Sequence, residues 1–117
     1  MQHNLKFGKE AEANAVDYFI SRGMQVRARN YRFKRAEIDL IVHVGDLLLF
    51  VEVKARSSLY FGYPESFVRH AKCLLYQKAA NEYIQNCDWE GDVRFDIVSV
   101  YKKNNRWSIT HFKDAFY

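Results

Sequence analysis

Hydrophobic and polar positions along the chain predict a helix, three strands, a second helix and two further strands. Apolar residues recur every three or four positions near the N-terminus and again after Pro64, which is the spacing of an amphipathic helix. Elsewhere they form short apolar runs or alternate with polar residues, as strands do. We expect helices at about 4–22 and 64–85, and strands at 24–33, 36–44, 47–56, 93–101 and 106–112.

This order of elements, αβββαββ, predicts an α/β fold in which one mixed sheet lies between two helices. With 117 residues the chain is long enough for one domain, 1–117, with a real hydrophobic core. Hydrophobic residues make up 49% of the chain and aromatic residues 16%, which indicates a globular protein rather than a disordered one.

The stretch 36–56 predicts a β-hairpin that turns at Gly45-Asp46. A two-residue turn places Asp39 directly opposite Glu52, and opposed residues share a face of the sheet. The same register places Glu37 opposite Lys54, so three carboxylates and one ammonium gather at one end of that face. The other face is expected to carry only apolar side chains: Ile38, Leu40, Val42, Leu49, Val51 and Val53.

Asp39 and Glu52 are carboxylates inside apolar strands, where an unpaired charge is costly. Carboxylate oxygens are ligands that Mg²⁺ accepts, so a divalent cation between them would account for both charges. Glu12 interrupts the apolar stripe of the first helix and is a third candidate ligand, directly or through water. Lys54 lies on the same face as Glu52, where it would polarise the attacking water or stabilise charge on a phosphate.

Two alternatives to a metal site stay open on this pattern. The acidic end of the hairpin is also compatible with a salt-bridged polar edge of a sheet that binds nothing. Glu12 is also compatible with a side chain that extends to solvent or pairs with an arginine.

A dense basic segment covers the first strand and the turn after it. Such a density of cations beside an acidic cluster suits a phosphate backbone held next to a metal site. The alternative is a solvated strand edge protected by charge. The formal net charge of +4 adds mild support for a polyanionic partner. The cations are Arg27, Arg29, Arg32, Lys34 and Arg35.

Two further cations are candidates for nucleic-acid binding. Arg56 opens a segment that is rich in aromatic residues up to Tyr63 and that could stack on bases or cover the edge of the sheet. Lys72 lies near the apolar stripe of the second helix and could reach a phosphate, or could simply extend to solvent.

The sequence lacks features that several classes of protein require. No apolar run approaches the roughly 18–20 residues of a membrane span, and the N-terminus lacks a secretory signal. Cys73 and Cys87 fit neither a metal motif nor a disulfide framework. The four histidines show no ligand spacing, and neither a nucleophile motif nor a glycine-rich phosphate loop is found. We therefore expect a cytoplasmic protein without a membrane partner.

The arrangement of Asp39 and Glu52-Val53-Lys54 resembles the PD-(D/E)xK nuclease motif of the restriction-endonuclease-like superfamily. Nearly the whole chain resembles the YraN-like family of uncharacterised bacterial proteins, which are similar to archaeal Holliday-junction resolvases. The segments that carry this resemblance are Gly8-x-x-Ala11-Glu12-x-x-Ala15, Arg29-Asn30-Tyr31-Arg32, Ala36-Glu37-Ile38-Asp39-Leu40-Ile41, Phe50-Val51-Glu52-Val53-Lys54-x-Arg56, Gly62 with Lys72, and Arg94-Phe95-Asp96.

The resemblance implies a restriction-endonuclease-like mixed sheet with the core order αβββαβ. It implies Glu12, Asp39 and Glu52 as ligands of Mg²⁺ or Mn²⁺, Lys54 as the catalytic lysine, and Lys72 as a position that faces substrate. The family usually has glycine where this chain has Ala11 and Ala36, and the superfamily motif has proline where this chain has Ile38. These departures remove no ligand.

The expected function is a metal-dependent DNA endonuclease. The resemblance to resolvases also implies a homodimer, because two cuts need two sites. A noncatalytic nucleic-acid-binding module is the alternative from another class. A third is an accessory subunit that works with a helicase or recombination partner.

Overall fold

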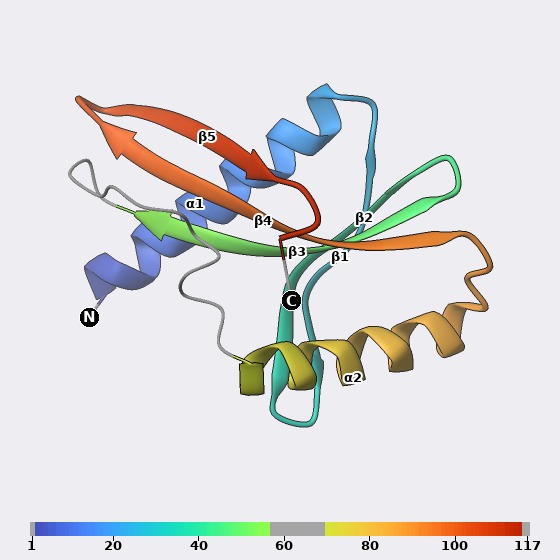
Figure 1. The fold of residues 1–117 in the computed structure, drawn as a ribbon. Coiled ribbons are helices and arrows are strands. Elements are labelled where there is room, and N and C mark those ends of the chain that lie inside the picture. Colours follow the sequence, from blue (N-terminus) through green and yellow to red (C-terminus); the bar gives the residue numbers. More distant parts are fainter. Residues whose placement is uncertain (1, 57–69, 116–117) are drawn as a thin grey trace.

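The computed structural model describes residues 2–56 and 70–115 and has the predicted order of elements (Figure 1). The predicted start of the second helix at Pro64 and the aromatic segment after Arg56 lie outside the described residues. Neither described helix has an apolar stretch long enough to cross a bilayer. The elements are α1 (Gln2–Ser21), β1 (Gln25–Phe33), β2 (Ala36–Val44), β3 (Leu47–Arg56), α2 (His70–Cys87), β4 (Asp92–Lys103) and β5 (Arg106–Phe112).

The described strands form one five-stranded sheet in the order β1-β2-β3-β4-β5. β3 and β4 are parallel and are connected through α2, whereas the other neighbouring strands pair antiparallel. This α/β arrangement is consistent with a restriction-endonuclease-like fold and confirms the predicted class.

The two helices cover opposite faces of the sheet (Figure 1). α1 packs Ala11, Ala15 and Phe19 onto apolar residues of β2, β3 and β4. α2 packs Tyr76 and two alanines onto the other face of β2 and β3. Two of the three buried positions of α1 are alanines, which lets this helix approach the sheet closely.

The register of the β2–β3 hairpin is the predicted one from Val44↔Leu47 to Leu40↔Val51. Gly45 in its turn has φ 54°, a conformation that glycine adopts without steric cost. The β4–β5 turn uses Asn104 and Asn105, both with positive φ, as a tight hairpin turn requires. Because two residues complete that turn, β4 continues to Lys103 instead of ending near residue 101.

The prediction that Ile38 and Leu40 share a face is wrong. Ile38 packs in the cluster under α2, whereas Leu40 packs in the cluster under α1. The pairing of β1 with β2 passes from Arg29↔Leu40 to Tyr31↔Ile38, and Asn30 and Asp39 form no pair between them. Asn30 has φ 53°, so the backbone leaves extended geometry there and the alternation of faces is interrupted.

Two leucines fit the apolar spacing of their helices in the sequence, which predicts burial, but are exposed in the structure. Leu5 of α1 keeps 67% of its surface accessible and Leu75 of α2 keeps 38%. The buried stripe of α2 is centred on Tyr76 and Ala80, which leaves Leu75 at its margin.

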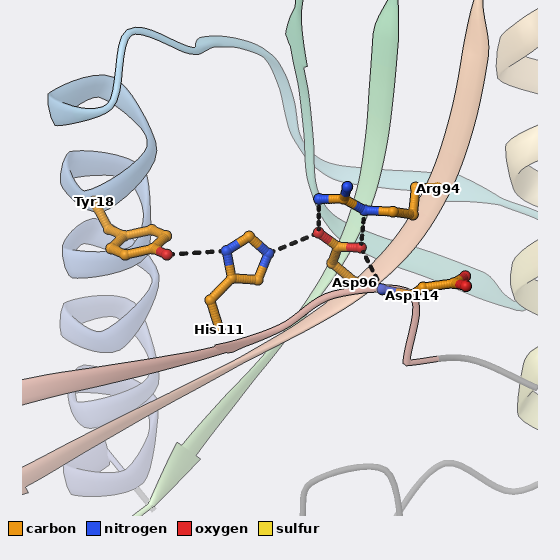
Figure 2. Close-up of polar contacts among 5 residues, drawn as sticks. All are labelled: Tyr18, Arg94, Asp96, His111 and Asp114. Atoms are coloured by element: carbon orange, nitrogen blue, oxygen red, sulfur yellow. Dashed lines mark hydrogen bonds and ion pairs between the residues drawn. The ribbon is translucent and has the colours of Figure 1, made fainter.

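A buried polar network connects α1, β4, β5 and the backbone that follows β5 (Figure 2). Asp96 accepts two hydrogen bonds from the Arg94 guanidinium at 2.8 and 2.9 Å and one from the Asp114 backbone N–H at 2.9 Å. His111 lies between Asp96 (2.6 Å) and the hydroxyl of Tyr18 (2.9 Å).

In the sequence, Asp96 stands among apolar residues of a predicted strand without a second acidic residue beside it, which predicts a structural partner of a nearby arginine rather than a metal ligand. The network confirms this prediction. Burial alone would raise the pKa of Asp96, but the hydrogen bonds from His111, Arg94 and the Asp114 backbone lower it to about 2. The folded state therefore favours the ionised carboxylate.

The Asp96→Asn variant should lower the free energy of unfolding by roughly 2–4 kcal/mol at pH 7, because it removes the buried charge that Arg94 requires. The stabilisation by Asp96 is complete above the pKa of an unfolded aspartate and is lost as the pH falls from about 4 to below 2. Urea unfolding measured from pH 7 to pH 2 should thus show that the free energies of unfolding of the wild type and Asp96→Asn become equal at the acid end.

The matched control is Asp17→Asn, an exposed aspartate on α1. It should stay within about 0.5 kcal/mol of the wild type at every pH. An Asp96→Asn protein whose difference from the wild type does not depend on pH would contradict the assignment.

Candidate functional site

Asp39 lies where the backbone ladder between β2 and β3 ends. The last backbone pair is Leu40↔Val51, one position before the predicted pairing of Asp39 with Glu52. Beyond it, the Val53 N–H donates a hydrogen bond of 2.8 Å to Oδ2 of Asp39. A carboxylate thereby connects the two strands, and Asp39 is half-buried at this point.

Glu52 is buried beside Asp39 and contacts two lysines. Its Oε1 accepts from Lys72 Nζ at 2.5 Å and lies 3.2 Å from Lys54 Nζ. Lys54 follows on the same strand, whereas Lys72 comes from the first turn of α2. Glu52 itself is 6% exposed, so these cations compensate a charge that water does not reach.

The charge on Asp39 is less well compensated than the charge on Glu52. Burial raises the pKa of Asp39, and the negative charge of Glu52 raises it further, to about 7. Glu12 and Glu37 contribute in the same direction, and the hydrogen bond from Val53 only partly opposes them. The pair of carboxylates therefore favours binding either a proton or another cation near neutral pH.

The two lysines respond to this environment in opposite ways. Burial and the neighbouring Lys72 lower the pKa of Lys54, although the charge of Glu52 raises it. Burial also lowers the pKa of Lys72, but its hydrogen bond with Glu52 outweighs this and raises the pKa overall. Lys54 is thus the lysine that releases a proton more readily, and Lys72 is the permanent cation of the site.

Glu12 lies near this cluster but is not part of a compact three-carboxylate group. It belongs to α1, which covers the face of the sheet opposite α2, and it is half-buried. Its charge reaches Asp39, since it contributes to the raised pKa of that residue. Within the described part of the chain, however, no three acidic, histidine or cysteine residues lie close enough to hold a metal ion.

The donor set nevertheless fits the way Mg²⁺ is commonly held. Asp39 bonds Val53 through Oδ2 and Glu52 bonds the lysines through Oε1, so these contacts do not use the second oxygen of either carboxylate. Mg²⁺ is usually bound by one or two carboxylates, with waters and substrate phosphates completing the octahedron. Asp39 and Glu52 would hold such an ion, and Glu12 contributes only its charge.

Two exposed cations of the predicted basic segment, Arg27 and Arg32, have partners on other elements. Arg27 donates a hydrogen bond of 2.8 Å to the hydroxyl of Tyr83 and also lies over the ring of Trp89. It therefore ties β1 to the end of α2. Arg32 pairs with Glu37 at 2.9 Å, so Glu37 contacts this arginine of β1 rather than Lys54 as expected.

The other predicted cations are arranged differently. Arg29, Lys34 and Arg35 are exposed on β1 and the β1–β2 turn. Arg56 is half-buried and donates to the carbonyl of Ala55 at 2.9 Å.

Comparison with known sequences places the chain in a family. Residues 11–100 match the uncharacterised protein family UPF0102. The chain belongs to this family, which comprises the YraN-like proteins. A UPF0102 protein of Flavobacterium psychrophilum is 43% identical over 116 residues, which cover 99% of this chain and 97% of the relative. Another from Natranaerobius thermophilus is 39% identical over 118 residues, covering 97% and 99% of the two chains.

In this UPF0102 protein the structure adds Tyr76, a residue that the sequence did not single out. Its phenol is 1% exposed, and burial raises its pKa well above the usual range, with further increases from the charges of Glu52 and Asp39. The signal in the sequence was its position one helical turn after Lys72. Tyr76 stays neutral and forms an apolar wall beside the carboxylates.

We predict that Asp39→Asn stabilises the metal-free UPF0102 protein at pH 8 by roughly 1–3 kcal/mol, because it removes a poorly compensated buried charge. A raised pKa means that the folded state loses stability as the pH rises from about 4 to 7. The advantage of the variant should therefore shrink as the pH falls through this window. Thermal unfolding in EDTA measures both effects.

Asp46→Asn, in the exposed turn of the same hairpin, is the matched control and should change stability little at either pH. If Asp39→Asn is less stable than the wild type at pH 8 without metal, the described imbalance of charge is wrong.

Proposed function

We propose that this UPF0102 protein is a metal-dependent DNA endonuclease that hydrolyses a phosphodiester bond beside Asp39, Glu52 and Lys54. The observation that carries the proposal is the placement of Asp39, bound by the Val53 N–H where β2 and β3 part, beside the buried Glu52 and its two lysines. Burial and the charge of Glu52 raise the pKa of Asp39 to about 7. A purely structural ion-pair network would be expected to compensate both charges, and perturbed groups of this kind are common at functional sites. The proposal agrees with the resemblance to the PD-(D/E)xK nucleases.

Asp39 and Glu52 would hold Mg²⁺ or Mn²⁺, and Glu12 would contribute its charge from α1. When bound, such an ion lowers the pKa of water and stabilises negative charge on a phosphate. The chain itself supplies a rigid frame for the two carboxylates. Asp39 is fixed by the Val53 N–H, and Glu52 is fixed by Lys72.

Lys54 is suited to handle the proton of the attacking water, because its Nζ is largely buried and its pKa is lowered. In the proposed reaction the water oxygen bonds to phosphorus while the bond to the 3′ oxygen breaks. The neutral form of Lys54 accepts the water proton, and the leaving 3′ oxygen takes a proton from solvent. The products are a 5′-phosphate and a 3′-hydroxyl. Lys72 keeps its charge and would offset the negative charge that develops on the phosphate.

The exposed cations of β1 and its turn would bind the phosphate backbone on either side of the cut. Arg29, Lys34 and Arg35 are accessible, and the chain carries a formal net charge of +4. Contacts of this type bind without regard to sequence and weaken as the salt concentration rises.

A noncatalytic DNA-binding module is the second candidate, and one observation favours it. Glu52 is already compensated by two lysines, and no compact group of three metal-binding side chains occurs in residues 2–56 and 70–115. On this interpretation the cluster only stabilises the fold. If the protein is instead an accessory subunit that works with a helicase or recombination partner, the isolated chain should likewise show no cleavage.

Lys54→Ala should reduce cleavage by about 10²–10⁴-fold, because it removes the proposed proton acceptor. Its affinity for DNA in EDTA should stay within a few-fold of the wild type, since Lys72 and the exposed cations remain. The assay is a panel of labelled junction, flap, nicked, duplex and single-stranded DNAs with Mg²⁺, Mn²⁺ or EDTA.

Lys103→Ala, which removes an exposed lysine from β4, should cleave like the wild type. If Lys54→Ala cleaves as fast as the wild type, the cleavage comes from a contaminant or from another site, and the assignment of Lys54 is wrong. If the wild type and both variants bind DNA but none of them cleaves it, the result favours the noncatalytic DNA-binding module.

Mn²⁺ should raise the melting temperature of the wild type, because a ligand that binds only the folded state stabilises it. At one hundred times the dissociation constant the gain is about 2.7 kcal/mol. Asp39→Asn should lose most of this gain. Equal gains in the two proteins would show that the metal binds elsewhere.

A further inference from the structure

A small hollow is lined by residues from the end of β1, the β1–β2 turn and α2. Figure 1 shows where these segments lie in the fold. The volume of the hollow is about 170 Å³. Two of its lining residues are apolar and three are cations, and none of the five is acidic: Phe33, Lys34, Arg35, Leu75 and Lys78.

The lining matches a ligand with an apolar ring and a negative charge. Phe33 offers a flat aromatic surface, and Leu75, which also lines the hollow, is 38% exposed although it is apolar. Lys34 has its Nζ 5.4 Å from the centre of the Phe33 ring, so the lining brings a cation close to an aromatic ring. A nucleotide combines the two features that these groups recognise, a planar base and a phosphate.

The size of the hollow argues for part of a larger molecule. Pockets that enclose a whole small ligand usually measure about 300–1,000 Å³. A volume of about 170 Å³ is well below that range. It suits one base whose sugar and phosphates stay outside, as in a polynucleotide strand.

The hollow is close to the candidate active site. Leu75 follows Lys72 by three residues on α2, and such residues lie on neighbouring positions of the helix surface, about 5–6 Å apart. Lys72 donates to Glu52. A strand held by the hollow would therefore pass the carboxylate cluster within a nucleotide or two.

We propose that this hollow holds one unpaired nucleotide of the DNA substrate, with its base between Phe33 and Leu75 and its phosphate among Lys34, Arg35 and Lys78. This inference rests on the proposed function and narrows its substrate. A base inside a duplex is stacked on both sides and cannot enter. The preferred substrate thus carries an unpaired nucleotide next to the cut, as branched, flapped or single-stranded DNA does.

The test is equilibrium binding in EDTA, where cleavage does not interfere. Three fluorescent DNAs are compared by anisotropy: a duplex, the same duplex with one unpaired thymidine, and the same duplex with an unpaired abasic nucleotide. The wild type should bind the unpaired thymidine about tenfold more tightly than the abasic DNA, since one accommodated base is typically a tenfold effect.

Leu75→Glu places a negative charge in the hollow and should abolish this preference for the base. Leu74→Glu makes the same change at the neighbouring exposed leucine, which does not line the hollow, and should keep the preference. Lys34→Gly should weaken binding without harming the fold, because Lys34 has φ 56°, which glycine adopts without cost.

Equal binding of thymidine and abasic DNA by the wild type would overturn the inference, as would a preference that survives in Leu75→Glu. Either result leaves the proposed nuclease untouched, because cleavage is measured separately with Lys54→Ala. Conversely, a preference for the unpaired base without metal-dependent cleavage would support base binding in the hollow and contradict the proposed nuclease activity.

Discussion

The burial of two carboxylates at the point where β2 and β3 part is the constraint on which the rest of the site depends. Glu52 is 6% exposed and Asp39 is half-buried, so bulk water stabilises both charges less than it would at the surface. Lys54 and Lys72 compensate Glu52, and the Val53 N–H binds Asp39. The compensation is incomplete, which is why the pKa of Asp39 is raised. A fold selected for stability alone would have little reason to keep this arrangement.

The division of the sheet between two helices determines which charges reach the site. α2 lies on the face of Glu52 and provides Lys72 and Tyr76, a permanent cation and an apolar wall. α1 lies on the other face and provides Glu12, which affects Asp39 only through its charge. Asp39 lies between these layers, because its neighbour Ile38 packs under α2 and its neighbour Leu40 packs under α1.

The partners of the cations on this UPF0102 protein distinguish cations that contact other elements of the fold from cations that remain accessible. Arg94 and Arg27 hold the fold together, through Asp96 and through Tyr83. Lys34 and Arg35 extend from a tight turn next to α2 and remain accessible. Net charge alone could not separate these groups, because a structural arginine and a substrate-binding one contribute equally to it.

Local patterns determined the order of elements, the β2–β3 register and the pairing of Asp96 with an arginine. These follow from short-range rules: apolar periodicity, the geometry of a two-residue turn, and the cost of an unpaired buried charge. Tertiary structure alone decided that Ile38 faces α2, that Leu75 is exposed and that Glu37 pairs with Arg32. It also brought His111 to Asp96 and Lys72 to Glu52. These contacts depend on a strand irregularity and on how the helices rotate against the sheet, which are set by packing between segments distant in sequence.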